Sequence, residues 1–574
     1  MSGIWKGLTH QPTFNASTML LLTDGTIMCQ ESGGINWHRL TPDSGGDYIN
    51  GTWSALAPMI NTRLYFASAV LRDGRVIVCG GEYSNAGSET NKCEIYNPLT
   101  DSWTAIPAPA GWTNIGDAAC CVLPDGRFLM GYYNGTKTAI FDPVVNTWSS
   151  GPNKGDSASE ETWTLLPDET VLAAQCVNHP HSEKYVIAAN NWVTAGSIPV
   201  DLVEASSIEI GPACLMPDGR VFCVGATGKT AIYTPPTIAS AAGTWTAGPD
   251  IPKVGGVTIG AKDAPGCLMP NGKVLFVGGP VDGVSGHYLS PTYFYEFDGA
   301  SIYRVSDPVN SSNVPYGGRM MLTPSGQVLF ASGSESIYCY VPGGYPDESW
   351  RPAITSIPYL VRHGHSYTLH GRQINGLSQA VAYGDDASSA TNYPVVRLRN
   401  TSTGKVYFCR TFDHSTMGVN TGTIIHSTNF YVPFGVPFGS YEITLIANGI
   451  SSYSHYIYIW DIIWWPPNIK VFEQYEIWNQ LIGSLADGPL WVLGPNGPIP
   501  VDPWGPKYAK QANEARTMVL KGLRDLQKLG SGIHEQRIKQ SALVPPALDD
   551  DTEDDDDKEK NAKRKPTKLS GKKV

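Results

Sequence analysis

The feature that most constrains this chain is a pattern that recurs about every fifty residues along its first 350 positions. Each copy consists of an apolar run, a turn and a second apolar run. Most copies end with a Trp or a Tyr. Five of the turns are Asp-Gly or Asn-Gly, the strongest short signal for a β-hairpin. The turn residues are Asp24, Asp73, Asp125, Asp168, Asp218, Asn271 and Ser325. The pattern therefore predicts repeated units built from short antiparallel strands.

A period near fifty is typical of kelch repeats, in which each repeat forms one four-stranded blade of a β-propeller. Because a single blade cannot bury both of its faces, the units must close into one body. We therefore predict an all-β chain with a seven-bladed kelch β-propeller over residues 1–350. The segment before Ala16, which contains Trp5, is expected to supply the last strand of the seventh blade. Such a closure leaves no exposed edge strand in the ring.

The repeat stops after Trp350, and the composition then changes several times. Short alternating segments over residues 351–460 predict an immunoglobulin-like β-sandwich. Residues 461–506 form a Pro/Gly/Trp-rich extension, and the apolar spacing over 507–530 predicts an amphipathic helix. Residues 531–574 run acidic and then basic without aromatic residues, and we expect this tail to be disordered.

Charge and cysteine usage limit the possible partners. The formal net charge of −11 argues against a nucleic-acid partner, and the absence of a long apolar run argues against a membrane span. The first residues lack the apolar stretch of a secretory signal. The odd number of cysteines, eleven, shows no paired spacing, so we expect reduced thiols and a cytoplasmic location.

Several repeats have a polar residue at the start of their first strand. Small or apolar residues would be expected there if these positions served only to pack the strand. Counting back eight or nine positions from the turns reaches four carboxylates, at Asp117, Glu160, Glu209 and Asp263, and two phenols, at Tyr65 and Tyr316. Loops that return to the same face add Tyr83, together with Tyr132, Tyr133, His179, His181 and Asp282.

Two interpretations of these residues stay open. They can be solvated rim residues that cap strand ends. They can also form an acidic, aromatic funnel for a polyhydroxylated or cationic ligand, because carboxylates accept hydrogen bonds from hydroxyls or amines while Tyr rings stack. Cys176, His179 and His181 have the spacing of metal ligands, but without a second pair of donors a polar loop is favoured.

The segments "RLYFASAVLRDGRVIVCGGEY" and "VPYGGRMMLTPSGQVLF", with the predicted domain order, resemble the galactose oxidase/glyoxal oxidase family of copper radical oxidases over about residues 15–460. In that family a cysteine-bridged Tyr, a second Tyr and two His hold copper, which oxidises alcohols or aldehydes with O₂. The resemblance places Tyr65 at the bridged Tyr, Tyr316 at the second Tyr and Tyr83 at a stacking Trp. It also places His414, in "TFDHSTMGVNTG", at the His that a loop of the second domain delivers into the propeller.

Two positions differ from the family in ways that matter chemically. Tyr316 is followed by Gly317, where the family has a His ligand, and Ala16 stands where the bridging Cys belongs. One imidazole and two phenolates match the tetragonal site of Cu(II) poorly. We therefore expect no cofactor and a pseudoenzyme-like chain that has lost the radical copper site.

The leading functional hypothesis is a binding protein whose propeller mouth takes a carbohydrate or a protein through Tyr83, Asp117, Glu160, Glu209 and Asp263. The alternative is a metal-dependent oxidoreductase, with copper held by Tyr65, Tyr316 and His414 and the two tyrosines as candidate catalytic residues. Glycoside cleavage by Glu160 with Asp117 is a third hypothesis, because paired carboxylates can serve as acid and base. A purely structural role in an assembly is the fourth.

Overall fold

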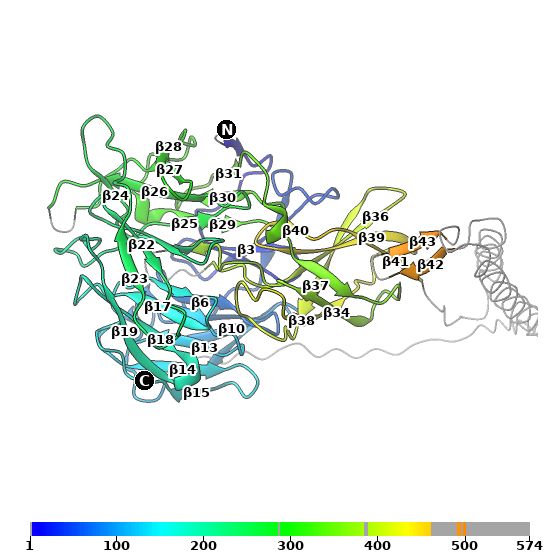
Figure 1. Cartoon of the computed structure of the whole chain (residues 1–574), viewed down its shortest axis with the longest axis horizontal. Helices are drawn as coiled ribbons and strands as arrows, with labels where there is room; N and C mark the ends of the chain where they lie inside the picture. Colours follow the sequence, from blue (N-terminus) through cyan, green and yellow to red (C-terminus); the bar gives the residue numbers. More distant parts are fainter. Residues whose placement is uncertain (1–2, 285–286, 384–388, 461–490, 495–496, 501–574) are drawn as a thin grey trace, which may run out of the picture. The chain divides into compact units, whose positions relative to one another are not determined.

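The computed structural model describes residues 3–284, 287–383, 389–460, 491–494 and 497–500. Within these residues, seven sheets form the blades of a β-propeller, which confirms the predicted all-β fold class. The first strands of successive blades contact one another all the way round a ring. Figure 1 shows the propeller strands in blue to green and the strands of the second domain, in yellow-green to orange-yellow, beside them.

Each blade is an antiparallel sheet whose first strand lies innermost. Blade 1 contains β2 (Ala16–Leu21), β3 (Ile27–Glu31), β4 (Trp37–Thr41) and β5 (Thr52–Leu56), and blade 2 contains β6 (Ala67–Val70), β7 (Val76–Cys79), β10 (Cys93–Asn97) and β11 (Ser102–Ile106). Blade 3 contains β12 (Cys120–Val122), β13 (Phe128–Gly131), β14 (Thr138–Asp142) and β15 (Thr147–Ser150), and blade 4 contains β16 (Trp163–Leu165), β17 (Thr170–Ala174), β18 (His181–Val186) and β19 (Asn191–Ser197).

The remaining blades follow the same order. Blade 5 contains β20 (Ala213–Leu215), β21 (Val221–Val224), β22 (Thr230–Thr234) and β23 (Thr244–Ala247), and blade 6 contains β25 (Gly266–Leu268), β26 (Val274–Pro280), β27 (Tyr293–Phe297) and β28 (Ile302–Arg304), with β24 (Ile259–Gly260) paired to β26. Blade 7 contains β29 (Arg319–Leu322), β30 (Val328–Ala331), β31 (Ile337–Val341) and β1 (Ile4–Gly7).

The first turn has the same geometry in blade after blade, and this geometry explains the repeated Asp-Gly pair in the sequence. In blade 2 the Asp73 carboxylate accepts a hydrogen bond from the backbone N–H of Arg75, and Gly74 adopts φ 86°. A left-handed φ favours glycine, which lacks the Cβ that clashes there. In blade 4 the glycine is replaced by Glu169, which still adopts φ 60°. The turn geometry therefore persists where the sequence signal is weakest.

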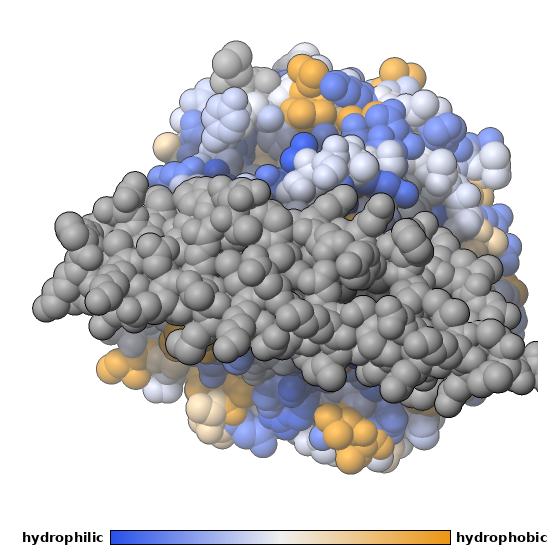
Figure 2. Space-filling view, turned by 90° about the vertical axis from the view of Figure 1, so that its right-hand side faces the viewer, coloured by the Kyte–Doolittle hydropathy of each residue, from blue (hydrophilic) through white to orange (hydrophobic). Residues whose placement is uncertain are grey.

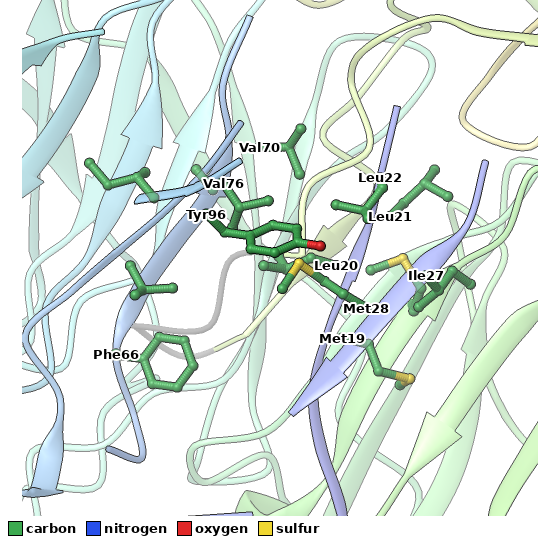
Figure 3. Packing of buried hydrophobic residues seen from close by; sticks show 14 of the residues in the cluster. Met19, Leu20, Leu21, Leu22, Ile27, Met28, Phe66, Val70, Val76 and Tyr96 are labelled. Atoms are coloured by element: carbon green, nitrogen blue, oxygen red, sulfur yellow. The ribbon is translucent and has the colours of Figure 1, made fainter. Parts of the chain in front are cut away.

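Apolar side chains between neighbouring blades form the core. Leu20 and Met28 of blade 1 lie beside Val76 and Tyr96 of blade 2, as Figure 3 shows, and all four side chains are buried. Both faces of a blade are covered in this way, which explains the nearly continuous apolar runs in the sequence.

The N-terminal strand closes the ring, as the sequence predicts. β1 pairs antiparallel with β31 of blade 7, with Trp5 opposite Tyr340. Figure 1 shows the N-terminus in blue beside the green β31. The Trp5 ring contacts Phe294 and Tyr340 with both centroid distances at 4.9 Å, and its Nε1 donates to the carbonyl of Ser306 at 2.7 Å. Trp5 therefore joins blade 7 to blade 6.

The second domain is a single curled sheet around its own apolar core. The strands predicted for the sandwich appear in this sheet. β33 and β41 pair in parallel, whereas an antiparallel sandwich contains no parallel pair. The path of the sheet joins β32 (Ala353–Ser356), β34 (Ser366–Arg372), β38 (Ile425–Tyr431), β37 (Val406–Phe412), β36 (Val395–Asn400), β39 (Gly439–Ala447), β41 (His455–Ile459) and β33 (Leu360–Val361), and β40 (Ile450–Ser451) pairs with β39.

One strand leaves the second domain and enters the propeller. β35 (Val381–Ala382) pairs antiparallel with β25, the innermost strand of blade 6. On the way in, the Gln379 side chain accepts from the backbone N–H of Leu165 in blade 4 at 2.8 Å, and on the way out Ser389 donates to the carbonyl of Met19 in blade 1 at 2.7 Å. We call residues 378–393 the channel loop, because its described parts contact the innermost strands of several blades.

The sequence predictions for the C-terminal part of the chain concern residues that the structure describes only in part. The chain divides into two compact units, residues 1–462 and residues 463–574, and in the second unit β42 (Trp491–Gly494) pairs with β43 (Gly497–Pro500). The predicted helix over 507–530 and the predicted tail over 531–574 lie outside the described residues. Among those described, none forms a helix that is both long and apolar enough for a membrane crossing. On the face in Figure 2, hydrophobic residues stand in small groups among hydrophilic ones, which is usual for a protein surface.

Candidate functional site

The first strand of each blade starts on the same face of the ring, which we call the entrance face. Tyr65 precedes β6, Asp117 precedes β12, Glu160 precedes β16, Asp263 precedes β25, and Tyr316 lies in the short turn before β29. The structure therefore brings to one face the residues that the repeat register predicts to lie there.

Several of these residues hold an unusual backbone conformation. Tyr65, Tyr83, Glu160 and Asp263 adopt φ values of 47°, 51°, 57° and 49°. A non-glycine residue in this left-handed region is uncommon and costs about 1 kcal/mol or more, so the surrounding structure must impose it. Residues of this kind are concentrated at functional sites. Tyr65, Glu160 and Asp263 stand just before the first strands of their blades.

Buried charges hold the backbone on which Tyr65 stands. The guanidinium of Arg63 donates to Glu94 at 2.5 Å and to the carbonyl of Gly80 at 2.7 Å, and both charged side chains are fully buried. The amide of Gln30 donates to the Arg63 carbonyl at 2.7 Å, and Leu64 bridges to Glu82 of β8 (Glu82–Ser84), the strand that carries Tyr83. The two phenols are therefore fixed by one local network.

Four tyrosine rings form a continuous row on the entrance face. The centroids of Tyr83 and Tyr65 lie 6.2 Å apart, those of Tyr65 and Tyr316 6.5 Å, and those of Tyr316 and Tyr288 5.0 Å. The ring planes in these contacts are inclined by 67°, 57° and 75°. The first and third contacts are therefore edge-to-face, and the contact of Tyr65 with Tyr316 is tilted. Tyr83, at the end of the row, has 70% of its surface exposed.

Tyr383 of the channel loop joins this row from the interior of the ring. Its hydroxyl lies 3.2 Å from the carboxylate of Asp263 and donates to the carbonyl of Tyr316 at 2.5 Å. The guanidinium of Arg319 lies 4.1 Å from the centre of the Tyr383 ring and 5.4 Å from that of Tyr65. A residue of the second domain thus helps to build the site.

Carboxylates surround the phenols and change their ionisation. The phenol of Tyr288 donates to Glu209, and burial with the charges of Glu209 and Asp263 raises the pKa of Tyr288 well above its usual value. Burial raises the pKa of Tyr133 to about 12, with a further contribution from Glu160. The phenols of Tyr288 and Tyr133 therefore ionise only at a higher pH than an ordinary tyrosine.

We define the entrance cluster as these phenols and carboxylates together. Its members are Tyr65, Tyr83, Tyr133, Tyr288, Tyr316, Tyr383, Asp117, Glu160, Glu209 and Asp263. Sequence reasoning did not find Tyr288 or Tyr383. The unusual length of segment 373–394, between β34 and β36, is the signal that would have directed attention to Tyr383, because long connections in compact domains often carry function.

The structure does not bring His414 to the entrance cluster, contrary to the prediction. His414 is fully buried among the turns of blades 2 and 3, where its backbone N–H donates to the carbonyl of Arg72 and the neighbouring Met417 donates to that of Pro124. Its Nδ1 lies 2.9 Å from the hydroxyl of Thr428. Burial, with the nearby charges of Arg72 and Arg410, lowers the pKa of His414 to about 3. The turns lie at the opposite ends of the first strands from Tyr65.

The other histidines named from the sequence have local partners. His179 lies 3.0 Å from the carboxylate of Asp201, His181 lies 3.1 Å from the hydroxyl of Ser197, and Cys176 donates to the carbonyl of Glu160 at 2.9 Å. In the described part of the chain, no group of three or more His, Cys, Asp or Glu side chains is arranged to hold a metal ion.

The copper site implied by the family resemblance does not fit these residues. Of its proposed ligands only Tyr65 and Tyr316 lie together, while His414 belongs to a different face. Gly317, where the family has a His ligand, offers no donor side chain, and a Cβ built there would meet its nearest neighbour, the Ser332 carbonyl, only at 3.9 Å. Two phenols without an imidazole are a poor donor set for Cu(II).

Comparisons with known proteins agree on the repeat. The Kelch motif matches residues 63–109. Kelch-like protein terF of Aspergillus terreus is 34% identical over 127 residues, which cover 21% of this chain and 26% of that protein. Human Kelch-like protein 23 is 33% identical over 143 residues, which cover 25% of this chain and 23% of that protein. The chain thus matches only about a quarter of the length of these relatives.

Among solved structures, a fungal alcohol oxidase of the AA5 family in complex with copper is similar at a TM-score of 0.47 and 16% identity, covering 80% of this chain and 100% of that chain. A catalytically inactive virginiamycin B lyase of Staphylococcus aureus is similar at a TM-score of 0.42 and 13% identity, covering 59% of this chain and 99% of that chain.

Proposed function

We propose that this kelch-repeat protein binds a carbohydrate or a protein at the entrance cluster and does not carry out radical copper oxidation. The observation that carries the proposal is the convergence of phenols from several blades and the channel loop with the carboxylates on one face. Phenol rings offer stacking surfaces, and carboxylates accept hydrogen bonds from hydroxyl or ammonium groups.

The positions of the ligands implied by the family resemblance support the absence of oxidase chemistry. Tyr65 and Tyr316 lie together, but His414 lies among the turns at the opposite ends of the first strands. Two phenols without that imidazole are a poor donor set for Cu(II). The proposal further assigns the protein to the cytoplasm as a pseudoenzyme, on the basis of its cysteine usage and the substitutions at Ala16 and Gly317.

Replacing Asp117 and Asp263 together with alanine is expected to weaken ligand binding by about 10-fold or more, because each removes a charged hydrogen-bond acceptor from the site. The measurement is binding of the full-length protein to glycan and peptide arrays. The matched control is Asp250→Ala with Glu442→Ala, which removes carboxylates from solvent-exposed ion pairs with Lys229 and Arg399.

The control variant should retain the wild-type binding profile. Equal binding by the wild-type protein and the Asp117/Asp263 variant would contradict the placement of the site on the entrance face. A loss of binding accompanied by a lower melting temperature would be checked with Asp117→Asn and Asp263→Asn, which keep the side-chain shape.

A further inference from the structure

The backbone of the channel loop is fixed where it carries Tyr383 to the entrance cluster. β35, which precedes Tyr383 by one residue, pairs with β25 of blade 6. The backbone N–H of Leu268 donates to the Ala380 carbonyl at 2.8 Å. The hydroxyl of Thr162, which stands just before β16 of blade 4, donates to the Tyr383 carbonyl at 3.4 Å. Two blades of the propeller therefore set the position of this tyrosine.

The hydroxyl of Tyr383 connects two members of the entrance cluster that come from different blades. It donates to the Tyr316 carbonyl at 2.5 Å and lies 3.2 Å from Oδ2 of Asp263. Tyr316 precedes blade 7, and Asp263 precedes blade 6. Each contact restricts the group that it reaches, because hydrogen bonds require a narrow range of distance and angle. The hydroxyl thus ties the Asp263 carboxylate to the turn that carries Tyr316.

Arg319 extends this connection to a third member of the cluster, Tyr65. Its guanidinium lies 4.1 Å from the centre of the Tyr383 ring and 5.4 Å from that of Tyr65, which is the range of cation–π contacts. Its Nη1 donates to the Tyr316 carbonyl at 2.7 Å, so this carbonyl accepts from both Arg319 and Tyr383. Arg319 is buried, and electrostatic contacts are stronger where water is excluded.

Tyr383 itself lies behind the surface that a ligand would reach. Only 4% of its surface is exposed, whereas Tyr83, at the end of the tyrosine row, is 70% exposed. A side chain that is this deeply buried acts on a ligand through the groups that it holds. Asp263 is such a group, and its left-handed φ of 49° is a conformation that surrounding contacts must impose.

We infer that Tyr383 is a positioning residue, which holds the Asp263 carboxylate and the Tyr316 turn in the arrangement that binds the ligand of the entrance cluster. The inference rests on the binding function proposed above. It adds that one side chain of the second domain determines the affinity of a site that is otherwise built on the propeller. Groups that are held in place before binding give tighter binding, because less conformational freedom is lost.

Tyr383→Phe tests this inference, because it removes the hydroxyl and keeps the ring that faces Arg319. The probes are the members of the glycan and peptide arrays that bind the full-length wild-type protein. The variant should bind these probes about 10-fold more weakly, since a hydrogen bond to a charged group is lost from the support of Asp263. Titration calorimetry with the selected probe measures the dissociation constant.

Tyr393→Phe is the matched control in the same loop. The Tyr393 hydroxyl also donates to a backbone carbonyl of the propeller, that of Leu21. Leu21 ends β2, on the side of the first turns, so this bond lies away from the entrance cluster. Tyr393→Phe should lower the melting temperature, because a buried carbonyl loses its donor, and it should keep the wild-type dissociation constant.

A double-mutant cycle separates positioning from a general structural role. Because Tyr383 is inferred to act in part through Asp263, Tyr383→Phe should weaken binding less in an Asp263→Asn background than in the wild-type background. A structural role alone would give the same loss in both backgrounds.

Each result decides a different point. Equal binding by the wild-type protein and Tyr383→Phe overturns the inference and leaves the proposed binding function in place. Equal losses in the two backgrounds, or an equal loss in Tyr393→Phe, also overturn it, because they show an effect on the fold as a whole. Failure of the wild-type protein to bind any array member contradicts the proposed function and this inference together.

Discussion

Replacing Lys154 with methionine is expected to lower the free energy of unfolding by about 3–5 kcal/mol, because it leaves two buried carboxylates without their cation. The Lys154 ammonium lies 2.8 Å from Glu161 and 2.6 Å from Glu183, and all three side chains are buried. It also lies 4.2 Å from the centre of the Trp192 ring. The urea midpoint of the full-length protein measures the change.

The control for this variant is Lys229→Met, which breaks an ion pair with Asp250 on the protein surface. Exposed pairs contribute about 0–1 kcal/mol, so this variant should unfold near the wild-type midpoint. Adding Glu161→Gln and Glu183→Gln to Lys154→Met should recover part of the loss, because no buried charge then stays uncompensated. Equal midpoints for the two lysine variants would contradict the description of this buried network.

The loss should depend on pH in a defined direction. Burial raises the pKa of Glu161 to about 7, against the lowering effect of Lys154, and the variant removes that lowering effect. A carboxyl whose folded-state pKa is above its unfolded value takes up a proton on folding, so its contribution to stability is present below the unfolded pKa and is lost as pH rises through the folded one. The variant should therefore be less impaired at pH 5 than at pH 8.

Replacing Trp5 with alanine is expected to destabilise the protein by about 3 kcal/mol, because a large side chain is lost between two blades. Trp5 contacts Phe294, Phe330 and Tyr340, and it is the residue through which β1 joins blade 7 to blade 6. Thermal unfolding of the full-length protein measures the effect. Ile4→Ala is the matched control in the same strand, because the Ile4 side chain is 56% exposed.

Removing residues 1–8 should have a larger effect than either substitution. It exposes the edge of β31, and an unpaired edge strand recruits other chains. Size-exclusion chromatography with mass measurement should then show self-association, which neither point variant is expected to cause. A monomeric truncated protein with wild-type stability would show that β1 does not close the ring.

The sequence was a reliable guide to the propeller, because its signals are local. An Asp at the first turn position accepts the hydrogen bond that closes the hairpin, and a glycine takes the left-handed φ that follows. A left-handed φ recurs at the second turn position of all seven blades, and an Asp or Asn acceptor recurs at the first position of six. The register that these turns define also placed Tyr65, Asp117, Glu160, Asp263 and Tyr316 on one face. Ring closure by Trp5 followed from the missing last strand of blade 7.

The sequence was a poor guide to contacts that join distant segments. The match of "DHSTMGVN" to a family motif placed His414 in the channel, yet that loop lies against the turns beside Arg72. The described residues of the channel loop contact the innermost strands instead, and its two-residue strand β35 is too short to be recognised by its pattern. The repeat pattern likewise did not show that Glu160 lies on the entrance face while its neighbour Glu161 is buried against Lys154.

The most direct test of the central claim is the metal content of the purified full-length protein after incubation with Cu(II) and dialysis. Because the structure places His414 at the turns beside Arg72 and not with Tyr65 and Tyr316, elemental analysis should find copper far below one equivalent, and no radical signal should develop. One tightly bound copper per chain, with hydrogen peroxide formed from an alcohol or aldehyde, would contradict the account of the entrance cluster as a binding site without radical chemistry.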